Sequence, residues 1–352
     1  MPAKKNIAIV GAGALGGHVG GYLARQGERI TFIDMWPENV ETIRRNGITL
    51  RGQSAPENFT VQAKAIHITE LQNAIKEAPF DLAFVSVKSY DTIWATEMIK
   101  PYLAPDAFVV SLQNSINEER IASVVGWGKT VGCIAATIAV ELIGPGLVQR
   151  NVALGGEKRL IFRVGEPHGR ITPRVQDVAQ MLACCDSSKP TDNLWGERWS
   201  KLVVNAMRNP VSAATGRGGN GNDRDPVTRV LALRIASEAI TVGMAHGYTL
   251  EDVYKMDPMK VKAAGEGDKA ALAYCEGVLM ENMKFRNDDQ RPSMGQDIQK
   301  GRRTEIDYIN GLVVAKAEEL GIETPANRGI IDAVRKIERG QAKPSPELVA
   351  SI

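Results

Sequence analysis

Apolar residues in the first half of the chain gather in short runs, which are separated by longer amphipathic stretches. The runs predict strands at 6–10, 29–34, 82–87, 107–112 and 131–138. Between several of them, helical segments are expected near 15–26, 37–46, 70–77, 90–103 and 117–125. Alternation of strands and helices favours a mostly parallel sheet with helices on both faces.

The pattern becomes irregular after the last of these strands and changes again beyond about residue 190. Gly144-Pro145-Gly146 and Gly155-Gly156 predict turns in an irregular, antiparallel extension that reaches Val164, and a helix follows near 173–184. Beyond about residue 190 the apolar spacing predicts long helices near 193–213, 225–247, 250–284, 295–320 and 325–340. We therefore expect an α/β domain over 1–190 and an all-α domain over 191–352.

A glycine-rich turn joins the first predicted strand to the first helix. Its residues are Gly11, Ala12, Gly13, Ala14, Leu15 and Gly16. In this context Gly11 permits the tight turn, Gly13 lets a pyrophosphate approach the backbone, and Gly16 lets the helix pack closely on the sheet. The helix N-terminus then faces the phosphates. The sequence predicts that these six residues bind a dinucleotide in a Rossmann domain; the alternative is a turn without a ligand.

Asp34 ends the second predicted strand. A carboxylate there accepts hydrogen bonds from the adenosine ribose hydroxyls and repels a 2′-phosphate, which favours NAD over NADP. The next residues contain no Arg or Lys, and Arg44 and Arg45 lie further along a predicted helix. The alternative is that Asp34 only caps the helix that starts near Pro37.

Composition narrows the class of protein. A chain of 352 residues with 43% hydrophobic residues and a net charge of +2 is typical of a two-domain soluble enzyme, and it gives no reason to expect nucleic acid or membrane partners. No signal peptide precedes the first strand, so we expect a cytoplasmic protein with reduced thiols. The four Cys and four His lack metal-ligand or Ser/His/Asp spacing, so no metal site is expected.

Polar residues follow two predicted strands. Lys88 lies in Ser86-Val87-Lys88-Ser89-Tyr90, and Asn114 lies in Ser111-Leu112-Gln113-Asn114-Ser115. Because ligands bind beyond the carboxyl ends of parallel strands, we expect Lys88 and Asn114 to face the cofactor. Each fits a solvated loop or a helix cap equally well.

Lys201, Asn205 and Asn209 recur every fourth residue on one predicted helix. This stripe offers one acid and two orienting amides. The alternative is a solvent-facing stripe, but Asn is a poor helix former and such faces usually carry Glu and Lys.

A second polar segment covers 291–311. Ser293 fits an N-cap, and Asp297, Gly301 and Glu305 are expected on one helical face. The mixture of polar residues suits a polar cleft better than an exposed charged helix. The glycine-rich stretch 216–223 lacks the features of a phosphate cradle, so an ordinary mobile loop is expected, with a lid as the functional alternative.

These motifs, in this order, resemble those of the ketopantoate reductases (2-dehydropantoate 2-reductases). The resemblance covers residues 6 to about 335 and includes Trp-Ser-Lys-Leu-Val-Val-Asn and Gly-Arg-Arg-Thr-Glu-Ile-Asp-Tyr-Ile-Asn-Gly. It implies a Rossmann domain followed by a helical domain like that of 6-phosphogluconate dehydrogenases, with the active site in the cleft between them. It also implies hydride transfer between a nicotinamide cofactor and a 2-keto acid, with ketopantoate and pantoate as the default pair and a place in pantothenate biosynthesis.

The resemblance also implies residue roles. Lys201 matches the general acid, and Glu305 matches the carboxylate that supports the substrate hydroxyl and the lysine. Asn114, Asn205, Asn209 and Ser293 match residues that hold substrate or cofactor, and Lys88 matches a lysine of the cofactor cleft.

Some positions depart from the family pattern. Ser115 stands where Gly usually follows Asn, Gln290 stands where some members have Asn, and Asp34 stands where many members carry an NADP-friendly residue. The alternative within the family is therefore an NAD-dependent dehydrogenase whose substrate is a different, branched or aromatic, 2-hydroxy acid. A non-catalytic NAD-binding protein is the alternative from another class, which the presence of Lys201 and Glu305 disfavours. The long helices and the resemblance favour a homodimer.

Overall fold

The computed structural model describes residues 4–288 and 290–352. The described chain divides into two compact units, and the division falls after Leu194. The division falls a few residues beyond the boundary expected from the sequence. The reason is β12 (Ser188–Thr191), which pairs with β11 (Phe162–Gly165) in the sheet of the first unit.

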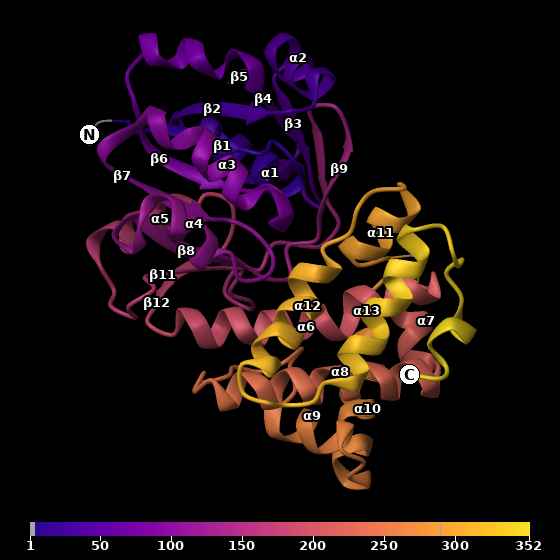
Figure 1. Cartoon of the computed structure of the whole chain (residues 1–352). Coiled ribbons are helices and arrows are strands. Elements are labelled where there is room, and N and C mark those ends of the chain that lie inside the picture. The colour runs from indigo at the N-terminus through magenta and orange to yellow at the C-terminus, as the bar shows by residue number, and fades with distance from the viewer. Residues whose placement is uncertain (1–3, 289) are drawn as a thin grey trace. The chain divides into compact units, whose positions relative to one another are not determined.

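The first unit is built on an eight-stranded sheet in the order β12-β11-β8-β7-β6-β1-β2-β5 (Figure 1). Its other strands are β1 (Asn6–Val10), β2 (Arg29–Asp34), β5 (Lys64–His67), β6 (Phe80–Val85), β7 (Leu103–Ser111) and β8 (Thr130–Ala135). All neighbours are parallel except β8 and β11. The expected mostly parallel sheet is confirmed.

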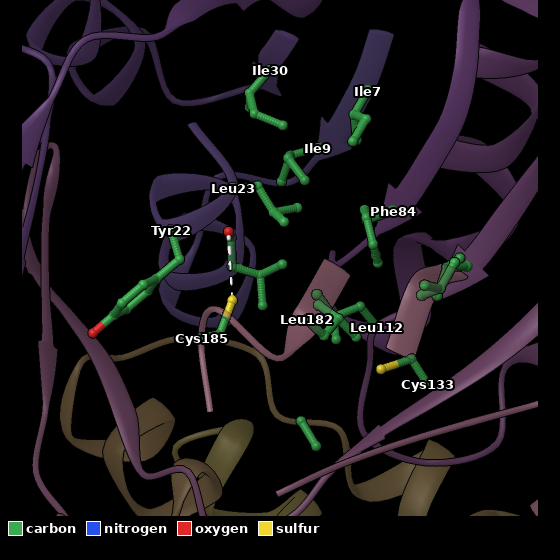
Figure 2. Close-up of a cluster of buried hydrophobic side chains, with 14 of the residues drawn as sticks. Ile7, Ile9, Tyr22, Leu23, Ile30, Phe84, Leu112, Cys133, Leu182 and Cys185 are labelled. Carbon is green, nitrogen blue, oxygen red and sulfur yellow. Dashed lines mark hydrogen bonds between the residues drawn. The ribbon is translucent and has the colours of Figure 1, made fainter. Parts of the chain in front are cut away.

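Alternate residues of the strands feed two separate cores. Ile7 and Ile9 of β1 belong to one hydrophobic cluster, drawn in Figure 2, and Ala8 and Val10 belong to the other. Helices α1 (Ala14–Arg25) and α5 (Pro173–Leu182) contribute to the first cluster, while α3 (Thr92–Ile99) and α4 (Glu118–Val125) contribute to the second. Both faces of the sheet are therefore covered, which is the doubly wound arrangement.

A second sheet has the order β4-β3-β10-β9, and only its antiparallel β9–β10 half corresponds to a sequence prediction. It consists of β3 (Ile48–Arg51), β4 (Phe59–Val61), β9 (Val140–Gly144) and β10 (Leu147–Arg150). The antiparallel turn between β9 and β10 was expected at Gly144-Pro145-Gly146, and Gly146 has a φ of 63° there. The strands β3 and β4 are too short to stand out as apolar runs.

Several predicted boundaries of the first unit were wrong. Residues 68–76 form a 3-10 helix. The helical stretch expected near 90–103 consists of α3 and two short 3-10 turns and ends at Tyr102, so β7 begins at Leu103 and not at the predicted residue 107. The strand expected to reach residue 138 ends at Ala135, because Thr137 and Ala139 adopt positive φ. Helix α2 (Pro37–Asn46) has the predicted bounds.

The second unit is helical, as expected. Its helices are α6 (Leu194–Thr215), α7 (Gly219–Arg224), α8 (Pro226–Ala245), α9 (Pro258–Gly265), α10 (Lys269–Met283), α11 (Ser293–Gln299), α12 (Ile306–Glu318) and α13 (Pro325–Glu338). The helix predicted over 250–284 is two helices, and so is the helix predicted over 295–320, where Gly301 has a φ of 61°. None of the described helices combines the length and the apolar composition needed to cross a membrane.

Candidate functional site

The turn between β1 and α1 accepts only glycine at its first position. Gly11 has a φ of 96°, and a Cβ there would lie 2.9 Å from Val87 Cγ1. The Gly11 N–H donates to the Ile33 carbonyl at 2.8 Å, which ties the turn to β2. The role predicted for Gly11, a tight exit from the strand, fits this geometry.

Gly13 has a different reason to lack a side chain. A Cβ at Gly13 would meet no atom of the described chain within 4 Å, and its φ of −72° is open to any residue. Gly13 is the N-cap of α1, makes no side-chain cap, and no acidic residue lies in the first turn. The backbone N–H groups and the positive end of the helix dipole thus suit a phosphate.

Glycines further along α1 bring the helix close to both sheets. A Cβ at Gly16 would lie 2.1 Å from Gly11 O and 2.3 Å from Ser86 Oγ. A Cβ at Gly20 would lie 2.4 Å from the Phe32 ring. A Cβ at Gly17 would likewise press against Val148, and one at Gly21 against Leu50, both in the second sheet. Close packing of this helix, predicted from its glycines, is confirmed.

Asp34 ties the end of β2 to the glycine-rich turn. Its Oδ2 accepts the Ala12 N–H at 2.6 Å, and its Oδ1 accepts the Trp36 N–H at 2.8 Å. Trp36, not Asp34, is the N-cap of α2, so the helix-cap alternative is wrong. Burial raises the pKa of Asp34, while the backbone N–H groups oppose that rise.

Asn39 is a residue of this site that sequence reasoning missed. Its buried amide donates to the Ala12 carbonyl at 3.1 Å and accepts the Gly146 N–H at 2.8 Å. Asp34 and Asn39 together hold both polar groups of Ala12. The available signal was a polar residue four positions before Ile43, on the buried face of α2.

The two arginines of α2 are engaged elsewhere. Arg44 donates to the Ala65 carbonyl at 2.7 Å and forms ion pairs with Glu41 and Glu70. Arg45 forms an ion pair with Glu41 at 3.5 Å, and its side chain is 77% exposed. Neither arginine is therefore held ready for a 2′-phosphate, which agrees with the argument from Asp34.

Lys88 and Asn114 lie beyond the carboxyl ends of the adjacent parallel strands β6 and β7. Asn117 links their loops, because its Nδ2 donates to Ser89 Oγ at 3.1 Å and to the Asn114 carbonyl at 2.8 Å. Both predicted residues are half-buried. Ser115 has a φ of 64°, so it occupies a left-handed conformation that glycine adopts more easily.

Helix α6 carries Lys201, Asn205 and Asn209. Asn209 is buried and the other two are half-buried, so the stripe is not a solvent-facing one. Within the described chain, the buried Nδ2 of Asn205 has no hydrogen-bond partner. Because buried polar groups are normally paired, this amide is suited to hold an acceptor on a ligand.

The segment that contains Ser293 and Glu305 differs from its prediction. Gly301 separates α11 from α12, so Asp297, Gly301 and Glu305 do not share one helical face. Ser293 is the first residue of α11, and the N-cap is Pro292. Glu305 is buried and is the N-cap of α12.

Both short helices pack on α6. A Cβ at Gly295 of α11 would lie 2.8 Å from Ser212 Oγ, and Asn310 of α12 donates to the Ala206 carbonyl at 3.1 Å. Helix α11, which begins at Ser293, and helix α12, whose N-cap is Glu305, therefore both contact the helix that carries Lys201.

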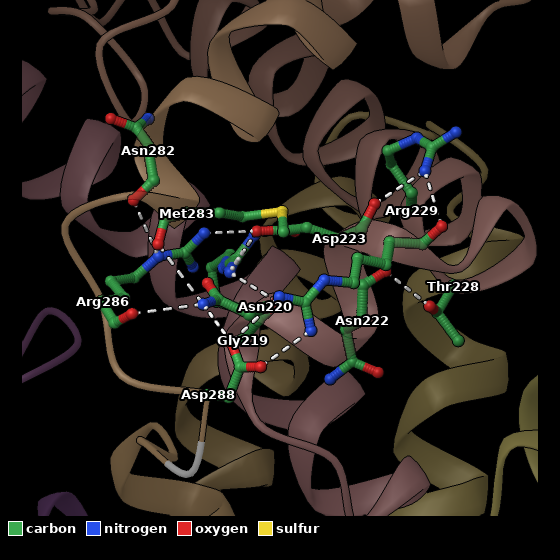
Figure 3. Close-up of polar contacts among 12 residues, drawn as sticks. Gly219, Asn220, Asn222, Asp223, Thr228, Arg229, Asn282, Met283, Arg286 and Asp288 are labelled. Atoms are coloured by element: carbon green, nitrogen blue, oxygen red, sulfur yellow. Dashed lines mark hydrogen bonds and ion pairs between the residues drawn. The ribbon is translucent and has the colours of Figure 1, made fainter.

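Residues 216–223 are not the mobile loop that we expected. Helix α7 begins at Gly219, and Asp223 forms buried ion pairs with Arg208 of α6 and with Arg286 at 2.7 Å. Figure 3 shows the contact between Asp223 and Arg286. A Cβ at Gly219 would lie 2.7 Å from Arg286 and 2.9 Å from Arg208. The glycines make room for guanidinium groups, and the stretch is a packed structural element.

No group of three or more His, Cys, Asp and Glu residues in the described ranges is arranged to hold a metal ion. The groups that the first unit offers to a ligand are instead the backbone N–H groups at the start of α1 and the Asp34 carboxylate, beside Gly13, which has no side chain. This set fits the pyrophosphate and ribose of a dinucleotide.

Both halves of the chain match models of one known protein family. The family model "Ketopantoate reductase PanE/ApbA" matches residues 7–158, and the model "Ketopantoate reductase PanE/ApbA C terminal" matches residues 193–338. A 2-dehydropantoate 2-reductase from Archaeoglobus fulgidus is 31% identical over 96% of this chain and 99% of its own.

Two solved structures show how far the fold is shared. A PanE/ApbA family ketopantoate reductase from Ralstonia eutropha has 29% identity and a TM-score of 0.77, over 95% of this chain and 99% of its own. A D-mandelate dehydrogenase, solved with NADH and anilino(oxo)acetate, has 22% identity and a TM-score of 0.77, over 95% of this chain and 98% of its own. The second likeness shows the fold alone. The two family models and the close relatives agree over nearly the whole length, and the chain belongs to the ketopantoate reductase family.

Proposed function

We propose that this protein is an oxidoreductase that reduces a 2-keto acid to a 2-hydroxy acid with a nicotinamide cofactor, with ketopantoate and pantoate as the default pair. The observation that carries the proposal is the stripe on α6, where the buried, unpartnered amide of Asn205 follows Lys201 by one turn.

A nicotinamide cofactor held by residues 11–16 and Asp34 would supply the hydride that the carbonyl carbon accepts. As negative charge develops on the carbonyl oxygen, the Lys201 ammonium stabilises that charge and donates the proton that completes the alcohol. The Glu305 carboxylate accepts a hydrogen bond from the substrate hydroxyl and supports Lys201. In the oxidative direction Lys201 accepts the proton instead.

Binding is divided between the two units. Residues 11–16 and Asp34 hold the pyrophosphate and ribose, with Lys88 and Asn114 contributing at the strand ends. The substrate is held by four side chains, Asn114, Asn205, Asn209 and Ser293.

We infer a preference for NAD. The Asp34 carboxylate, fixed by the N–H groups of Ala12 and Trp36, leaves lone pairs for the ribose hydroxyls and disfavours a 2′-phosphate. NADP remains the alternative. A homodimer also remains a prediction, to be tested by light scattering of the purified protein.

The second candidate substrate is an aromatic or branched 2-keto acid. It is favoured by the NAD argument from Asp34. Ketopantoate and phenylglyoxylate, assayed in parallel with NADH and NADPH, separate the two candidates and settle the cofactor.

The decisive experiment is Lys201→Ala on whichever substrate is turned over. We expect kcat to fall by about 10²- to 10⁴-fold, the usual contribution of a general acid, with cofactor affinity retained. Unchanged turnover would remove Lys201 from the mechanism. Absence of turnover with every keto acid, together with tight NADH binding, would instead favour the non-catalytic alternative.

A further inference from the structure

Pro210 lies inside α6, one residue after Asn209. In a regular helix the N–H of residue 210 would donate to the carbonyl of Ala206. Proline has no N–H, and its ring presses against that same carbonyl, so the Ala206 carbonyl loses its partner in the helix. The Ala206 carbonyl that loses this hydrogen bond lies between Asn205 and Asn209 in the chain, within the proposed substrate-binding stripe.

Asn310 of α12 replaces the lost donor. Its side chain is completely buried, and its Nδ2 donates to the Ala206 carbonyl at 3.1 Å. The two residues are 104 positions apart in the chain. The carbonyl freed by Pro210 is therefore satisfied from another helix.

A chain of hydrogen bonds fixes the orientation of this amide. Asn310 Nδ2 also donates to Asn327 Oδ1 at 3.0 Å, and Asn327 Nδ2 donates to Glu238 Oε2 at 2.8 Å. Glu238 in turn accepts the N–H groups of Ala326 and Asn327 at the start of α13. A flipped Asn310 amide would turn its oxygen toward two acceptors.

The arrangement leaves one group unsatisfied. Asn310 Oδ1 is buried and has no hydrogen-bond partner in the described chain. An apolar residue of similar size would avoid this cost. The two donated hydrogen bonds must therefore provide what an apolar side chain cannot.

We propose that Asn310 is a positioning residue: by binding the Ala206 carbonyl that Pro210 frees, it sets the course of α6 and so the placement of Asn205 and Asn209 against Lys201. The proposal rests on the proposed function, because these are the side chains assigned there to substrate and proton transfer. Asn310 acts only through α6, and the proposal includes no contact between Asn310 and the substrate.

The test is a cycle of Asn310→Leu and Pro210→Ala. We expect Asn310→Leu to lower kcat by about 10- to 100-fold, since small misplacements of reacting groups have effects of that size. The dissociation constant for NADH should not change, because the proposed cofactor residues are on the first unit. In the Pro210→Ala background the helix regains its own donor, so Asn310→Leu should lower kcat much less.

Asn282→Leu is the matched control. Asn282 is a buried asparagine of α10 whose Oδ1 accepts from Lys255 at 3.1 Å. It should cost stability without a comparable loss of kcat. Equal losses from Asn310→Leu in both backgrounds, or a loss that Asn282→Leu reproduces, would overturn the proposal.

Hydrogen exchange separates this proposal from the proposed function. Asn310→Leu should speed amide exchange in the peptide over 204–215 of α6, and Pro210→Ala should suppress that effect. This readout needs no substrate. If the wild-type protein turned over no keto acid, the proposed function would be wrong. The hydrogen-exchange experiment would still decide the role of Asn310. Unchanged exchange in Asn310→Leu would overturn that role.

Discussion

The glycine-rich turn and the middle of α6 both leave backbone groups outside regular hydrogen bonding, and they use them differently. At the turn, the missing side chain of Gly13 exposes the N–H groups of α1 to a ligand. In α6, the carbonyl freed by Pro210 is bound by a buried side chain of the same unit. The first site is formed by leaving side chains out, and the second by adding buried polar ones.

This difference predicts opposite sensitivities. The turn should lose stability or cofactor affinity when a side chain is added to it. The packing around α6 should lose stability when a buried polar partner is removed. The following changes test that contrast.

The largest effect is expected for Asp223→Asn. The carboxylate faces two guanidinium groups, and it raises the pKa of Arg208 although burial alone would lower it. Removing its charge leaves buried cations unpaired, which costs about 3–5 kcal/mol. Urea denaturation should show the loss. Asp288→Asn, at the exposed pair with Arg224, is the control and should have a far smaller effect.

Gly16→Ala should destabilise the first unit by about 3 kcal/mol, since overpacking against fixed backbone has costs of this order. The new Cβ would lie 2.1 Å from the Gly11 carbonyl oxygen. Better helix propensity returns only about 1 kcal/mol. Thermal unfolding measures the difference, and a variant as stable as the wild type would show that the turn can yield.

A change of pH should act on α1 through His18. Its burial, with the nearby Arg150 charge, lowers its pKa from 6.5 to about 3. Below pH 6.5 the unfolded chain binds a proton that the folded chain does not, so this contribution to stability is complete above pH 6.5 and is lost toward pH 3. Between pH 7 and pH 5 the loss is about 2 kcal/mol.

His18→Gln removes this contribution. The free energies of unfolding of the variant and the wild type should therefore approach each other as the pH falls from 7 to 5. Parallel pH profiles would mean that His18 does not titrate differently in the folded and unfolded chains.

The smallest effect is expected for Gly13→Ala. The backbone conformation suits alanine and no protein atom lies near the added methyl, so the melting temperature should not change. A bound pyrophosphate would meet the methyl group, and we expect about tenfold weaker NADH binding, or about 1.4 kcal/mol. Fluorescence titration measures it. Undiminished affinity would separate Gly13 from the cofactor.

The sequence by itself determined the features that depend on local pattern. The turn at 11–16, the acidic end of β2 and the bounds of α2 follow from apolar runs, glycine spacing and helix signals within a few residues. The same reasoning identified the stripe on α6, because a period of four residues is visible without knowledge of any partner.

Only the tertiary structure decided which polar groups are buried and what binds them. Residues 216–223 had the composition of a loop, but Arg208 and Arg286 from distant segments hold Asp223 in a packed helix. Asn39 and Asn310 looked like ordinary helix residues until the carbonyls of Ala12 and Ala206 lay beside them. A hydrogen bond across 104 residues leaves no local pattern, because its two ends meet only when the helices pack.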